Sequence, residues 1–112
     1  MVHMSRGSLA LSDDEFLSAL ERCELPAAEF THAAHVRAAY LYLSRGDFDS
    51  ALARIRRSIR AYSAHLGKAD RYDEAMTAAY LALIHGRMAP CAGVDGWEAF
   101  ARANPDVVTR RL

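Results

Sequence analysis

The sequence predicts an all-α protein, folded as a compact bundle of about five helices. Apolar residues recur at the three- and four-residue steps of amphipathic helices. Residue types that favour helix starts and helix ends, chiefly Ser, Thr, Asp and Gly, flank these segments. No segment alternates apolar and polar residues as a half-buried β-strand does. A flexible N-terminus at 1–11 precedes a single helical domain at 12–112, with helices expected over 12–23, 31–45, 47–66, 71–85 and 95–103.

The first two predicted helices have well-marked boundaries. Ser12 and Glu15 form an S-x-x-E capping box, in which each side chain accepts a hydrogen bond from a backbone amide of the helix start. Thr31 supplies the side-chain oxygen that an N-cap needs at the start of the second helix. Gly46 then follows that helix, as glycine commonly does just beyond a helix end.

The later helices follow the same rules. Asp47 caps the third helix and Gly67 ends it, while Asp70 is the expected N-cap of the fourth helix and Asp95 that of a short fifth. The last residues open a further helix without completing it, so we expect the chain to be truncated at Leu112. An amphipathic stripe of the third helix consists of Phe48, Leu52, Ile55, Ile59, Tyr62 and Leu66.

The helices over 31–45 and 71–85 are apolar on nearly every face. Such helices belong in the middle of a bundle, where neighbours cover them on two sides. A chain of 112 residues has few outer helices with which to cover two of them. We therefore predict a homodimer, in which a second copy covers what the chain itself leaves exposed.

Composition and charge exclude several classes of protein. The 14 basic and 14 acidic residues cancel, so the chain lacks the positive field of a nucleic-acid-binding protein. No apolar run is long enough for a membrane span, and no secretion signal opens the chain. Cys23 and Cys91 lack paired spacing, which predicts reduced thiols and a cytoplasmic location.

Two histidines at the start of the second helix form the candidate site. With Thr31 as N-cap, His32 and His35 lie on one face of the first helical turn. The positive end of the helix dipole disfavours their protonated forms, and a neutral imidazole is what a metal ion or a general base requires. Asp73 would complete the set if the two apolar helices pack with their N-terminal ends together.

The predicted site is therefore a His32, His35 and Asp73 pocket, either catalytic or a centre for a divalent transition metal. A small metabolite is the expected ligand, and acid–base chemistry is favoured over hydrolysis because no nucleophile stands out. Whether the protein is an enzyme is left open. Three further residues are expected to contact the ligand, namely Arg37, Tyr72 and Thr77.

A purely structural interpretation stays open beside this one. The histidines can donate hydrogen bonds to backbone carbonyls or to Tyr72. Asp73 would lie three residues after the Asp70 cap, where a carboxylate is favoured by the exposed amides of a helix start.

An interaction module is the alternative function. Gly46, Phe48 and Ala51 have the spacing of a tetratricopeptide repeat, which suggests a protein-binding groove beside the third helix. The echo of residues 48–52 at 72–76 has an offset of 24 residues, however, and that repeat requires 34.

The chain also resembles a group of small bacterial all-helical proteins of unknown function. These proteins pair an F-x-H-x-x-H-x-x-A segment with a Y-H-x-x-x-T segment and a W-x-x-F helix before Asn-Pro. The resemblance implies a three-histidine site, from which this chain departs because Asp73 stands where the family has its third histidine. The matching positions are Phe30, His32, His35, Ala38, Tyr72, Thr77, Trp97, Phe100, Asn104 and Pro105.

Overall fold

Six α-helices and two short 3₁₀ turns make up the part of the chain that this computed structural model describes, residues 11–88 and 96–109. No β-strand occurs among those residues, which confirms the predicted all-α fold class. The α-helices are α1 (Asp13–Glu21), α2 (His32–Ser44), α3 (Phe48–His65), α4 (Glu74–Met88), α5 (Trp97–Ala103) and α6 (Pro105–Thr109), and the 3₁₀ turns are η2 (Ala27–Glu29) and η3 (Ala69–Arg71).

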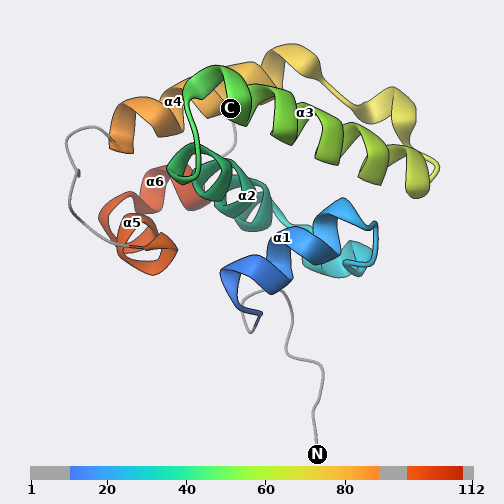
Figure 1. Ribbon diagram of the computed structural model, residues 1–112, viewed down its shortest axis with the longest axis horizontal. Helices are drawn as coiled ribbons and strands as arrows, with labels where there is room; N and C mark the ends of the chain where they lie inside the picture. Colours follow the sequence, from blue (N-terminus) through green and yellow to red (C-terminus); the bar gives the residue numbers. More distant parts are fainter. Residues whose placement is uncertain (1–10, 89–95, 110–112) are drawn as a thin grey trace, which may run out of the picture.

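Helix α2 lies at the centre of the fold (Figure 1), where it packs against α3, α4, α5 and α6. Helices α3 and α4 run side by side along one side of α2, while α1 and α5 lie toward the opposite side. Residues 36–43 of α2 are all buried, as its apolar sequence predicts. Every α-helix contributes side chains to the core, among them Leu20, Tyr42, Ile55, Ile84, Phe100 and Val107.

The predicted caps determine where the first three helices begin. The amide of Ser12 donates to Glu15 Oε1 at 2.9 Å and the amide of Glu15 donates to Ser12 Oγ at 3.1 Å, which completes the capping box of α1. Thr31 Oγ1 accepts from the amide of Ala34 at 3.2 Å, and Asp47 caps α3 in the same way. These bonds confirm the three predicted N-caps, so the histidines stand in the first turn of α2.

The fourth helix begins later than its sequence predicts. Its N-cap is Asp73, whose Oδ1 accepts from the amide of Met76 at 2.9 Å. Asp70, the predicted cap, lies in η3, because the chain makes a 3₁₀ turn before the helix starts. At the other end α4 continues through Gly86 to Met88, since this glycine has helical backbone angles, whereas Gly67 after α3 has a φ of 73° and ends that helix.

Some predicted features lie outside the described residues. These are the N-terminus except Leu11, the cysteine at 91, the cap at 95 and the chain end at 112. The predicted fifth helix is present as α5, and the last helix opens at Pro105 as α6.

Helix α4 is not covered on two sides by the described residues. Only Leu81 and Ile84 of this helix are buried, so the described residues do not themselves supply the cover on two sides that the sequence predicts. A row of apolar side chains on its outer side is exposed, namely Ala75, Met76, Ala79 and Ala82. Despite its apolar sequence, neither α4 nor another helix in the described ranges has the length and apolar character needed to span a membrane.

Candidate functional site

A cavity of about 580 Å³ lies between α2, α3 and α4. Its volume falls within the range of about 300–1,000 Å³ that small-molecule sites occupy. The helices supply apolar walls, and a polar rim comes from the first turns of α2 and α4 and from the connection between α3 and α4. The apolar walls include Val36, Ala39, Ile55, Ile59 and Ile84.

Five of the six residues predicted from the sequence line this one cavity. Helices α2 and α4 run in the same direction (Figure 1), so both place their first turns at the same side of the cavity. This is the arrangement on which the predicted site depends. The residues brought together are His32, His35, Tyr72, Asp73 and Thr77.

The imidazole of His32 bridges α2 and α6. Its Nε2 lies 3.0 Å from the backbone carbonyl oxygen of Val107. A carbonyl can only accept, so Nε2 carries the proton and the neutral ring keeps its lone pair on Nδ1. The ring also contacts the edge of Tyr80, with 5.2 Å between the centroids. Both contacts hold the ring of His32 at the cavity wall.

The imidazole of His35 is fixed by its own helix start. Its Nδ1 donates to the backbone carbonyl of Thr31 at 2.8 Å, which leaves the lone pair of the neutral ring on Nε2. The ring stacks on Phe30, with centroids 3.8 Å apart and planes inclined by 21°. Phe30 in turn meets the edge of Tyr62, a buried residue of α3. The ring plane of His35 is therefore set by a stack that reaches the core.

Asp73 serves the start of α4. Its carboxylate accepts from the amide of Met76, and its backbone carbonyl accepts from both the amide and the hydroxyl of Thr77, at 3.0 and 2.9 Å. Among the described residues, no three His, Cys, Asp or Glu side chains lie close enough to hold a metal ion. The predicted metal set of His32, His35 and Asp73 is thus not assembled, because capping directs the Asp73 carboxylate to the amides of its own helix.

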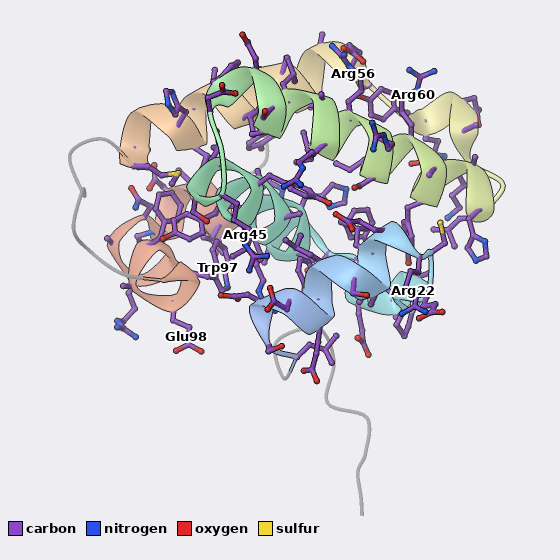
Figure 2. All side chains as sticks on the ribbon, in the orientation of Figure 1. Arg22, Arg45, Arg56, Arg60, Trp97 and Glu98 are labelled. Atoms are coloured by element: carbon purple, nitrogen blue, oxygen red, sulfur yellow. The ribbon has the colours of Figure 1, made fainter. Side chains whose placement is uncertain are left out.

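Tyr72 stands at the rim of the cavity between two charged groups of α3 and α4. Its hydroxyl donates to Glu74 Oε1 at 3.1 Å, and Arg60 lies over its ring at 5.8 Å from the centroid. Arg56 Nε donates to Glu74 Oε2 at 2.6 Å, and this bond lowers the pKa of Glu74. Partial burial raises the pKa of the Tyr72 hydroxyl. Figure 2 shows Arg56 and Arg60 together along the upper edge of α3.

Two basic residues of the rim were not predicted. Lys68 and Arg71 line the cavity from the connection between α3 and α4. The backbone is held there by two bonds, from the amide of Lys68 to the carbonyl of Ser63 and from the amide of Arg71 to the carbonyl of Lys68. Neither side chain has a hydrogen-bond or ion-pair partner among the described residues. The only sequence signal for them is two cations beside Gly67 and Asp70, a pattern that surface loops commonly share.

Arg37, the sixth predicted residue, lies elsewhere. It comes five positions after His32, which places it on the far side of α2. Its guanidinium donates to the backbone carbonyl of Leu11 at 2.8 Å and to Asp13 Oδ1 at 2.9 Å, and it lies over the ring of Phe16. Arg37 therefore anchors α1 to α2 and does not line the cavity.

Comparison of the chain with models of protein families, with curated proteins and with solved structures finds no significant match. The resemblance to small bacterial helical proteins therefore stays a prediction.

Proposed function

We propose that the protein binds a small organic molecule in the cavity between α2, α3 and α4, in contact with His32 and His35. One observation carries this proposal. Two imidazoles line the same cavity, and each has one ring nitrogen fixed by a backbone carbonyl. Such bonds orient a ring and set its tautomer, which is how ligand-binding and catalytic histidines are prepared.

The fixed tautomers define what the rings offer a ligand. In the neutral state His32 presents an acceptor at Nδ1, and the ring of His35 lines the same cavity with its Nδ1 bonded to Thr31. Both histidines stand in the first turn of α2. A neutral imidazole of fixed tautomer is also what a general base requires, so acid–base chemistry on the bound molecule is the extension of this proposal.

The walls of the cavity support an apolar body for the ligand. Val36, Ile55 and Ile59 come from the buried faces of α2 and α3 and also line the cavity. An apolar surface of this kind gains about 25 cal/mol for each Å² that a ligand removes from water. A molecule with an apolar body and a hydrogen-bonding group is thus the expected ligand.

N-phenyl-1-naphthylamine, an uncharged aromatic probe whose fluorescence rises in apolar surroundings, tests the cavity. We expect saturable binding that the cavity-filling change Ala39→Phe abolishes, because Ala39 is buried in the cavity wall. Ala53→Phe is the matched control, since it places the same side chain at an exposed position of α3 that does not line the cavity. Circular dichroism verifies that both variants are folded.

The histidines provide a second readout. In nitrogen-15 spectra of the imidazole rings, addition of the probe should shift the signals of His32 and His35. His65 and His85 are exposed and do not line the cavity, so their signals should stay in place. Probe binding without a change at His32 and His35, or equal binding by the Ala39→Phe variant, would contradict the proposed function.

We also propose that a second copy of the chain covers the exposed apolar face of α4, defined above by Ala75, Met76, Ala79 and Ala82. The face is uncharged, whereas the first turn of α4 is acidic at Glu74 and its last turn is basic. An antiparallel pair of these helices would bury the face against its own copy. Glu74 and Arg87 already form ion pairs within the chain, with Arg56 and Asp106, so burial of the apolar face is what would hold the two copies together.

A further inference from the structure

The cavity rim carries more positive than negative charge. Lys68 and Arg71 each contribute one positive charge, and Asp73 is the one carboxylate among the described residues that line the cavity. The Asp73 carboxylate is already hydrogen-bonded to the amide of Met76. One positive charge therefore remains, on two side chains that have no hydrogen-bond or ion-pair partner in the described part of the chain.

Backbone dipoles add to this positive rim. The first turns of α2 and α4 both line the cavity, through His32 and His35 on one side and Asp73 and Thr77 on the other. A helix start carries a partial positive charge that favours an anion. The last carbonyls of α3, at residues 62–64, accept from the amides of residues 66–68 and so are already satisfied.

The basic groups and the apolar walls belong to one cavity. Lys68 and Arg71 stand in the connection between α3 and α4. The apolar surface is supplied by residues within the two helices, namely Ile55, Ile59 and Ile84. A ligand that satisfies both parts has a charged end and an apolar body.

We infer that the ligand of this cavity is an amphipathic carboxylic acid, bound through its carboxylate by Lys68 and Arg71 and through its apolar part by α2, α3 and α4. This inference rests on the proposed function and names its substrate class. A guanidinium and an ammonium form charge-assisted hydrogen bonds with a carboxylate. A carboxylate matches the one positive charge that the side chains of the lining leave over, and titration with octyl phosphate checks this choice against a phosphate ester.

Octanoate and octanol test the inference, because they share one apolar chain and differ in the charged group. Isothermal titration calorimetry of the unmodified protein should show octanoate binding about fivefold to tenfold more tightly than octanol. The double change Lys68→Gln and Arg71→Gln should remove that difference and leave octanol affinity within about twofold. Octyl phosphate, titrated beside them, should bind no more tightly than octanoate.

A matched control separates the effect of charge at the cavity rim from the effect of the net charge of the protein. Arg57 and Arg102 are exposed and do not line the cavity. The double change Arg57→Gln and Arg102→Gln alters the net charge by the same amount, so it should leave the preference for octanoate intact. A similar loss in both double variants would overturn the assignment to Lys68 and Arg71.

The failure of this inference is distinguishable from that of the proposed function. If octanoate and octanol bind with equal affinity, or if neither binds, the assignment of a carboxylic acid as the ligand is wrong. The proposed function still stands in that case, provided that the naphthylamine probe binds in the cavity and that Ala39→Phe prevents its binding. If octyl phosphate binds more tightly than octanoate, the ligand class is a phosphate ester. If Ala39→Phe leaves both octanoate and the probe bound as before, the cavity is not the site and both proposals fail.

Discussion

His32 donates from Nε2 to the carbonyl oxygen of Val107 across 3.0 Å, and this bond joins the first residue of α2 to α6, 75 positions later in the chain. Val107 is buried, and His32 is the side chain that reaches its carbonyl. One side chain thus connects the candidate site with the end of the fold. The ring that faces the cavity also holds α6 against α2.

Replacement of His32 by Leu should therefore lower the free energy of unfolding. The Val107 carbonyl would lose its hydrogen bond from His32 in a part-buried environment, which costs about 1–2 kcal/mol. Urea unfolding followed by circular dichroism measures the change. His65→Leu is the control, because His65 is exposed and its loss should change stability by less than about 0.5 kcal/mol. Equal stability of the two variants would show that the bond to Val107 contributes nothing.

Arg37→Met should destabilise the protein and leave the cavity unaffected. Arg37 is only 5% exposed, and removing it leaves the Leu11 carbonyl and Asp13 without their cation. The free energy of unfolding should fall by about 1–3 kcal/mol, because the Leu11 carbonyl loses a charged donor, whereas Asp13 is 42% exposed and regains contact with water.

The control for this change is Arg45→Met. Arg45 pairs with Asp14 at the surface, where an ion pair contributes about 0–1 kcal/mol. Both variants should bind the naphthylamine probe as the unmodified protein does, measured below their unfolding transitions. A folded Arg37→Met protein that no longer binds the probe would place Arg37 at the site after all.

Tyr42 should make stability fall at alkaline pH. Burial raises the pKa of its hydroxyl, and the hydrogen bond that it donates to Glu21 at 2.6 Å adds to this effect. The folded protein then keeps a proton that the unfolded chain releases above about pH 10, so this stabilisation is present below that pH and is lost as pH rises toward the folded pKa.

Tyr42→Phe isolates this effect. At neutral pH the variant should be about 1–2 kcal/mol less stable, because Ser58 and Glu21 lose their common partner. The difference from the unmodified protein should narrow as pH rises above about 10. Urea unfolding of both proteins at several pH values measures it. A difference that stays constant with pH would mean that Tyr42 ionises equally in both states.

The sequence predicts local features of the site better than its long-range ones. Thr31 sets the start of α2, and the three-residue spacing then fixes His32 and His35 on one face. Asp70 and Asp73 are both possible N-caps of α4. Because Asp70 lies in the 3₁₀ turn η3, the helix starts later and Asp73 is its cap. No local pattern marks the carbonyl of residue 107 as a partner, because that contact depends on how distant helices pack.

The difference between local and long-range features also explains why two basic residues of the cavity were not predicted and why Arg37 was wrongly expected there. Arg37 is near His32 in sequence, but helical phase turns it to the opposite side of α2. Lys68 and Arg71 reach the cavity through the backbone path between two helices. Helix propensity determines which segments are helical. The path of the connection between α3 and α4 determines which charged side chains reach the cavity.

The exposed face of α4 gives the last prediction, an association between two copies of the chain. Ala79 lies in the middle of this face, where Arg would place a charge opposite its own copy in the antiparallel pair. Sedimentation equilibrium should show a dimer for the unmodified protein and a monomer for Ala79→Arg, because a buried like-charge pair costs several kcal/mol. Ala53→Arg, at an exposed position of α3, should remain dimeric. A monomer at all concentrations for the unmodified protein, or a dimer that Ala79→Arg leaves intact, would exclude this face as the contact between copies.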